Sequence, residues 1–205
     1  MKNFIPAQTT QEQIFCKQIR EIALKSQKTG NACYIGFLDE RQQQLAAAQL
    51  SGIAGLQHLF FGGFSAAERK VLCVCEILPS EDSFPICVAR ASAKIGGSAL
   101  THRDYLGALM NLGFDRKCIG DILVTQDGAY LMLMTLHAPL LCDELKTVGR
   151  VTVSLQLCDT VPQELTAGQG AEQSLNVASL RLDAVLAAVL HTARGQADEV
   201  IRSGK

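Results

Sequence analysis

The sequence predicts an α+β protein, and three observations point to this class. A clearly delimited helix is predicted over residues 101–112, with apolar segments typical of strands before and after it. The spacing of apolar residues changes repeatedly between a period of about 3.6 residues and a period of two. Clusters of Gly, Pro, Asp and Ser separate these segments at short intervals. Helices and strands mixed in this way favour an α+β fold.

The composition is that of an ordinary globular protein. The chain has 205 residues, of which 48% are hydrophobic and 19% are charged, so it is long enough to bury a sizeable core. Its apolar runs end well before the ~18 residues that a membrane helix needs, and its N-terminus has no apolar signal core. We therefore expect a cytoplasmic protein with no membrane partner. The net charge of −1 gives no argument for nucleic acid, so that argument depends on local patterns.

The eight cysteines fall mostly inside apolar periodic segments, so we expect buried thiols rather than a disulfide framework. Cys73 and Cys75 are the only close pair, and their spacing is one residue short of the usual zinc-knuckle pattern. The four histidines are scattered singly. We therefore expect no metal and no cofactor.

Residues 1–83 are predicted to form a small N-terminal α/β domain, which ends at the turn cluster Pro-Ser-Glu-Asp-Ser. Glycines, including the pair in Phe-Phe-Gly-Gly-Phe, interrupt the apolar pattern in its second half. The predicted elements are a helix over 10–26, a strand over 32–37, a helix capped by Asp39 that runs to residue 50, and a strand over 71–77.

Residues 84–158 are predicted to form a central domain in the order β-α-β-β-α-β. This is the ferredoxin-like arrangement, which is also the topology of the RNA-recognition motif. The predicted elements are strands over 85–90, 120–125, 130–134 and 150–157, helices over 101–112 and 139–146, and a hairpin turn at 126–128.

The helix over 101–112 has a marked start and a marked end. Thr101 stands where an N-cap is expected and Asp104 follows three residues later, which predicts a capping box with Asp in place of Glu. Tyr105 and Leu109 recur at helical spacing, so one face of the helix is predicted to be buried. Gly113 stands where a left-handed C-cap is needed.

The last part of the chain divides into a linker and two short helices. Residues 159–178 are rich in Gln, Gly, Thr and Glu and lack periodicity, which predicts a linker. Residues 179–205 predict one helix that opens at Ser179, a break at 191–195 and a second helix over 196–202.

Two short motifs have competing interpretations. His102-Arg103-Asp104 has the letters of a kinase catalytic loop, but Leu109 occupies the position of the magnesium-binding Asn and no glycine-rich phosphate loop precedes it. We therefore read Asp104 as a cap and Arg103 as a surface charge. Arg116 and Lys117 follow the helix on a loop, where they either contact RNA phosphates or keep the loop soluble. The sequence does not decide between these two roles.

The sheet of an RNA-recognition motif binds single strands through stacked aromatic side chains on its middle strands. Tyr130 is the only aromatic residue in the corresponding strand, which is otherwise aliphatic. We therefore expect another element to cover this sheet, and we disfavour direct reading of single strands.

The C-terminal segment resembles the αL RNA-binding domain named after small-subunit ribosomal protein S-four. The similarity rests on Arg181-Leu-Asp183, the leucine-spaced helix after it, Ala193-Arg194, and the ending Gly204-Lys205. In that family, basic side chains of two short helices contact RNA phosphates. The resemblance implies such a role for Arg181, Arg194, Arg202 and Lys205.

The alternative interpretation of this segment is a helical hairpin with solvated charges. Three acidic residues, Asp183, Asp198 and Glu199, nearly balance its four cations. The strand that completes such a domain would follow Lys205, so we expect this chain to hold only a partial αL domain.

Most of the chain resembles the YlmH family of bacterial RNA-binding proteins. The family has an N-terminal α/β domain, a central RNA-recognition-like domain and a C-terminal αL domain. The resemblance implies binding to structured RNA (rRNA and tRNA), with the large ribosomal subunit as partner, and a part in handling stalled translation. We expect no binding to DNA. Arg103, Arg116 and Lys117 are candidates to extend the RNA surface. The segments that carry the similarity are 37–39, 62–63, 67–70, 100–104, 106–110, 112–113, 120–124, 149–155 and the opening of the αL segment.

Two rival functions remain open at this point. Pseudouridine synthases also carry αL domains, usually at the N-terminus and beside a separate large domain with a catalytic Asp. We find no second Arg-Leu-Asp followed by a Thr-Gly turn, and therefore expect no enzyme. A protein–protein adaptor would instead expose an apolar patch on residues 130–134. The oligomeric state cannot be predicted from this sequence.

Overall fold

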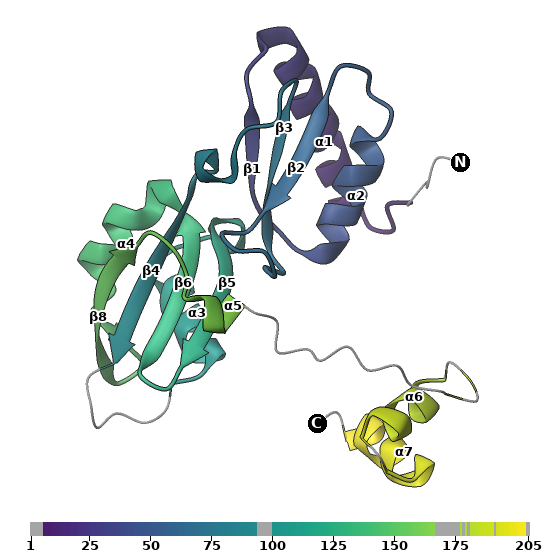
Figure 1. Cartoon of the computed structure of the whole chain (residues 1–205), viewed down its shortest axis with the longest axis vertical. Helices are drawn as coiled ribbons and strands as arrows, with labels where there is room; N and C mark the ends of the chain where they lie inside the picture. The colour runs from purple at the N-terminus through teal and green to yellow at the C-terminus, as the bar shows by residue number, and fades with distance from the viewer. Residues whose placement is uncertain are drawn as a thin grey trace. The chain divides into compact units, whose positions relative to one another are not determined.

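The computed structural model describes residues 6–93, 100–166, 177, 179, 181–190 and 192–203. The chain divides into two compact units, residues 1–167 and residues 168–205 (Figure 1). Helices and antiparallel sheets are combined in the first unit, which confirms the predicted α+β class. None of the helices in the described ranges is both long and apolar enough to span a membrane.

The first unit begins with a three-stranded antiparallel sheet in the order β1-β3-β2, with two helices along one face (Figure 1). Asp39 caps the second helix in a capping box with Gln42, as its position in the sequence predicts. The sequence does not predict strand β2, because the glycines that follow it interrupt the apolar pattern. The elements are α1 (Thr10–Thr29), β1 (Cys33–Leu38), α2 (Glu40–Leu50), β2 (Gln57–Phe61) and β3 (Lys70–Cys75).

An ion pair joins α1 to α2 and makes the stability of this unit depend on pH. Arg41 donates from Nε to Glu12 Oε1 at 2.9 Å and from Nη2 to Oε2 at 3.3 Å. These bonds, followed by the backbone amide of Gln8, lower the pKa of Glu12 to about 2 from its ordinary 4.5. Because the folded pKa lies below the unfolded one, the stabilisation is fully present above about pH 5 and is lost as the pH falls from about 4.5 towards 2.

We therefore expect the difference in unfolding free energy between the native chain and Glu12→Gln to be constant near neutral pH and to shrink below about pH 4.5. Urea unfolding at several pH values measures it. Glu21→Gln is the control, since Glu21 makes only an exposed contact of 3.9 Å with Lys17. A difference between native chain and Glu12→Gln that stays constant down to pH 2.5 would contradict this account.

A five-stranded antiparallel sheet in the order β5-β6-β4-β8-β7 forms the second half of this unit. Its four long strands have the strand order of a ferredoxin-like fold, as predicted, and β7 adds a short edge strand. The elements are η1 (Glu81–Ser83), β4 (Ile86–Ala93), α3 (His102–Asn111), η2 (Arg116–Cys118), β5 (Ile119–Thr125), β6 (Gly128–Met134), η3 (Thr135–His137), α4 (Ala138–Glu144), β7 (Thr147–Val148) and β8 (Val151–Cys158).

Local sequence signals specify the ends of α3. The hydroxyl of Thr101 accepts from the amide of Asp104, and the Asp104 carboxylate accepts from the amide of Thr101, so the predicted capping box is confirmed. Gly113 has φ 85°, the left-handed conformation that the sequence predicts at the end of this helix. The capping bonds fix where α3 begins, and the left-handed glycine marks where it ends.

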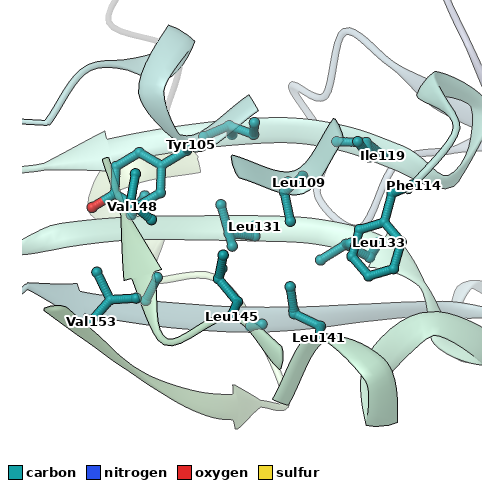
Figure 2. Packing of buried hydrophobic residues seen from close by; sticks show 14 residues of the cluster. Tyr105, Leu109, Phe114, Ile119, Leu131, Leu133, Leu141, Leu145, Val148 and Val153 are labelled. Carbon is teal, nitrogen blue, oxygen red and sulfur yellow. The ribbon is translucent and has the colours of Figure 1, made fainter. Parts of the chain in front are cut away.

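The core on one face of the five-stranded sheet joins α3 and α4 to the strands. Figure 2 shows Leu109 of α3 beside Leu131 of β6, with Leu141 of α4 pointing into the same cluster. The members that Figure 2 labels are Tyr105, Leu109, Phe114, Ile119, Leu131, Leu133, Leu141, Leu145, Val148 and Val153.

The other face of this sheet packs against the N-terminal sheet. Alternate residues of β6, Tyr130 and Met132, belong to a second cluster together with Val71 and Cys73 of β3. The opposite face of β3 packs on α1 and α2 instead. A strand exposes alternate residues on opposite faces, so β3 and β6 each connect two layers.

The stretch expected to be a linker begins inside this unit. Val161 is buried in the second cluster, and Leu165 on the short helix α5 (Gln163–Thr166) packs against it. The cluster holds these residues even though their sequence shows no periodicity.

Within the described residues of the second unit, helices α6 (Leu182–Val189) and α7 (Arg194–Ser203) pack against each other. Helix α7 begins two residues earlier than predicted, because the carbonyl of Ala193 accepts from the amides of Gln196 and Ala197. The side chain of Ala197 is fully buried, and Ala184 and Ala187 of α6 are also buried. Small side chains at these positions let the two helices approach closely.

Candidate nucleic-acid interface

Two of the predicted RNA-binding residues meet at one carboxylate. Asp183 Oδ1 lies 3.1 Å from Arg181 Nε, and Asp183 Oδ2 lies 3.3 Å from Arg194 Nη2. The two arginine side chains remain 76% and 56% exposed, whereas that of Asp183 is 22% exposed. An arginine has five N–H donors, so each guanidinium keeps donors for a further acceptor.

The charge of Asp183 is stabilised where it lies. Its partial burial opposes ionisation, but the hydrogen bond from Arg181 and the charges of Arg181 and Arg194 outweigh this effect. The pKa of Asp183 therefore lies below its ordinary value. The carboxylate stays ionised at neutral pH and holds both arginines.

The other predicted residues of the C-terminal segment lie apart from this pair. Arg202 forms an exposed ion pair with Asp198, one turn earlier on α7, at 2.8 Å. Lys205 lies outside the described residues. The described residues of this unit include three arginines and three acidic residues, so their charges cancel. These residues therefore carry no net positive charge that would attract RNA from a distance.

The candidates on the central domain do not form one patch. Arg103 is exposed in the first turn of α3, whereas Arg116 and Lys117 lie in η2, beyond the other end of the same helix. Lys117 pairs with Asp115 at 3.2 Å, and Arg116 is partly buried and donates to the carbonyl of Ile119 at 3.4 Å. Burial lowers the pKa of Arg116. The carbonyl of Arg116 accepts from Arg69, so Arg116 is part of the contact between the two sheets.

That contact is centred on Arg69 and Asp121, two residues that we did not predict to be important. Arg69 donates to the carbonyls of Ile119, Phe37 and Arg116 at 3.0, 2.9 and 3.1 Å. In return, the carboxylate of Asp121 accepts from the amides of Glu68 and Arg69 at 2.7 and 3.0 Å. We call this set of bonds the Arg69–Asp121 junction. Both residues lie in segments that carry the family resemblance, and this was the only indication in the sequence that they matter.

A cavity of about 330 Å³ lies beside the Arg69–Asp121 junction. Its charged groups are largely engaged: Arg69 donates to three carbonyls, Asp39 caps α2, and Lys117 pairs with Asp115. The cavity therefore offers few free polar groups to a ligand. Among the described residues, no group of three or more His, Cys, Asp or Glu side chains could hold a metal ion.

The sheet face that an RNA-recognition motif uses is closed. Tyr130 is 9% exposed and Met132 is fully buried, and Arg90 lies over the Tyr130 ring with its guanidinium carbon 5.8 Å from the ring centroid. Bases have no access to this face, as the lack of aromatic residues predicts. The same burial removes the exposed patch on residues 130–134 that an adaptor would need.

Comparisons with known proteins give consistent matches. A family model described as "Putative RNA-binding domain in YlmH" matches residues 79–161. The chain is 31% identical over 170 residues to ribosome-associated protein quality control protein P2 of Bacillus subtilis (strain 168). That alignment covers 82% of this chain and 66% of the relative, so the chain spans just under two thirds of the relative's length.

A solved structure has a similar fold. The cell division protein ylmH from Streptococcus pneumoniae matches with a TM-score of 0.63 and 26% identity, over 76% of this chain and 96% of that chain. The family model covers the segment from just before β4 to just after β8, which contains the five-stranded sheet. These matches agree with the motifs found in the sequence, and the chain therefore belongs to the YlmH family.

Proposed function

We propose that this chain is a non-catalytic, ribosome-associated RNA-binding protein that docks on structured RNA through its C-terminal helical hairpin. The observation that carries the proposal is the pair Arg181 and Arg194, which share one carboxylate and remain largely exposed. The description of the family model and the name of the Bacillus subtilis relative support it. In this assignment residues 179–205 contact RNA, and residues 159–178 connect them to the domains over residues 1–83 and 84–158.

The mode of recognition follows from which groups are accessible. A planar guanidinium suits phosphate oxygens, and phosphate contacts fix position without reading sequence. The aromatic stacking that reads single strands is prevented here by the burial of Tyr130 and Met132. We therefore propose recognition of the shape and backbone of folded RNA.

The partners in this proposal are rRNA of the large subunit and tRNA, in the cytoplasm, during the handling of stalled translation. The relative's name refers to ribosome-associated protein quality control, which supports this choice. An enzyme of the pseudouridine-synthase type is the alternative. Asp183, in its Arg-Leu-Asp sequence, lies at a helix start between two arginines, which suits an ion-pair role. We expect analysis of RNA products to find no isomerised uridine.

Co-sedimentation with separated ribosomal subunits across a salt series tests the proposal. We expect binding to the large subunit that weakens as salt rises. The double variant Arg181→Ala, Arg194→Ala should bind on the order of tenfold or more weakly near 0.1 M salt. The slope of log K against log salt should fall by about two, one for each phosphate that the variant no longer neutralises.

The matched control is Arg20→Ala, Lys25→Ala, which removes two exposed cations of α1 and so changes the net charge equally. Its affinity and slope should stay near those of the native chain. Absence of binding at low salt would overturn the proposed function. Equal weakening by both double variants would show that net charge, and not the hairpin, determines binding.

A further inference from the structure

Asp183 is the least exposed charged side chain of the hairpin's ion pairs, and it contacts both candidate anchors. Its two carboxylate oxygens are divided between the two arginines, one at 3.1 Å and the other at 3.3 Å. By contrast, the i,i+4 pair of Asp198 and Arg202 is exposed on both sides, as surface pairs on helices commonly are.

The packing of the helices explains why an arginine at the start of α7 can reach the start of α6. The buried residues Ala184, Ala187 and Ala197 allow close packing, and the amide of Thr192 donates to the carbonyl of Ala187 at 3.0 Å. Together they hold the turn between the helices tightly against α6. The long side chain of Arg194 then extends to the carboxylate of Asp183 in the first turn of α6.

A carboxylate between two guanidiniums has two effects. It offsets the repulsion between the two cations, so both can be held close together. It also restricts the two arginine side chains before RNA is bound, so they lose less rotational freedom on binding. The donors that do not face Asp183 remain available to acceptors in solvent.

We propose that Asp183 is a positioning residue for RNA binding, which holds Arg181 and Arg194 as one preformed pair for phosphates of an RNA backbone. This inference rests on the proposed function and goes beyond it, because it assigns a favourable role in RNA binding to an acidic residue. General electrostatics makes the opposite prediction, since removal of any acid near an RNA surface should strengthen binding.

The sign of the effect is therefore the test, measured by co-sedimentation with purified large ribosomal subunits at one salt concentration. We expect Asp183→Asn to weaken binding by on the order of fivefold, although it makes the chain more positive. Asp198→Asn removes the same charge from the same hairpin and is the matched control. It should leave the affinity unchanged or increase it slightly.

A second comparison separates positioning from a loss of structure. In the Arg181→Ala, Arg194→Ala background, Asp183→Asn should no longer weaken binding and should slightly strengthen it, because no pair remains to be positioned. Asparagine has nearly the same shape and volume as aspartate, so the far-ultraviolet circular dichroism of Asp183→Asn should match that of the native chain.

Each outcome has a distinct meaning. If the native chain binds through its arginines but Asp183→Asn binds equally or more tightly, the positioning role is overturned and the proposed function stands. If Asp183→Asn weakens binding equally with and without the arginines, its role is structural and the inference is also overturned. If the native chain does not bind at low salt, the proposed function fails and the positioning role fails with it.

Discussion

Arg69→Met should destabilise the first unit by about 3 kcal/mol, because it removes the hydrogen bonds that Arg69 donates to three main-chain carbonyls. A hydrogen bond contributes roughly 0.5–1.5 kcal/mol, so three bonds together account for about 3 kcal/mol. The carbonyls of Ile119 and Arg116 each keep a second donor, the guanidinium of Arg116 and the amide of Ile119. Methionine keeps much of the length of the arginine stem, so the change removes hydrogen bonds more than packing. The cost therefore reports on the Arg69–Asp121 junction.

Urea unfolding followed by tyrosine fluorescence measures this effect. All three tyrosines of the chain, Tyr34, Tyr105 and Tyr130, lie in the first unit, so the signal reports that unit alone. Arg103→Met is the control, since Arg103 is exposed on α3 and should change stability by less than about 0.5 kcal/mol. If Arg69→Met were as stable as this control, the junction would contribute little to folding.

Gly128→Ala should be at least as damaging, at about 3 kcal/mol or more. Gly128 begins β6 with φ 155°, and a β-carbon added there would collide with the carbonyl oxygen of Ala91 on β4. The obstacle is backbone in the middle of the sheet, so a strand would have to move to relieve it. Loss of the pairing between β4 and β6 would then spread to both apolar clusters that β6 joins.

Gly107→Ala is a matched substitution with the opposite expected sign. Gly107 lies within α3, and an added β-carbon would meet nothing within 4 Å. Alanine favours a helix over glycine by about 0.8–1.0 kcal/mol, so this variant should be more stable than the native chain. The same tyrosine signal measures both variants. Destabilisation by Gly107→Ala would indicate that α3 does not tolerate side chains at that position.

Features set by neighbouring residues were predictable from the sequence. The capping box of Thr101 and Asp104, the left-handed Gly113 and the hairpin between β5 and β6 each depend on a few adjacent residues. The order of strands and helices in the central domain follows from such local signals, since few topologies fit them. The bounds of the elements differ from the predicted ones by a few residues.

Features set by distant contacts were not predictable in the same way. Strand β2 is a strand because His58, Leu59 and Phe60 pair with β3, whereas its sequence is followed at once by two glycines. At the Arg69–Asp121 junction, the bonding groups are mostly backbone amides and carbonyls more than 30 residues away in sequence. Because nearly every residue has the same backbone groups, the sequence does not indicate which of them form these bonds.

The candidate interface contains residues that the sequence identifies and one residue whose role only the structure reveals. Arg181 and Arg194 were identified through the resemblance to αL domains. The sequence predicts no positioning role for Asp183, which belongs to the αL motif and offsets the cations, because the sequence does not reveal that α7 begins at Arg194 and packs close to α6. Whether Arg103, Arg116, Lys117, Arg202 and Lys205 contact RNA stays a prediction.

The second apolar cluster, which the two sheets share, can form only after both β3 and β6 have been synthesised. The apolar face of β3, with Val71 and Cys73, leaves the ribosome roughly sixty residues before β6 has been made to cover it. At ~5–20 residues per second, the growing polypeptide presents this uncovered surface for roughly 3–12 s. Chaperones that bind exposed apolar segments thus have time to act on the first half of the chain, and each molecule remains prone to aggregation until residue 134 has emerged.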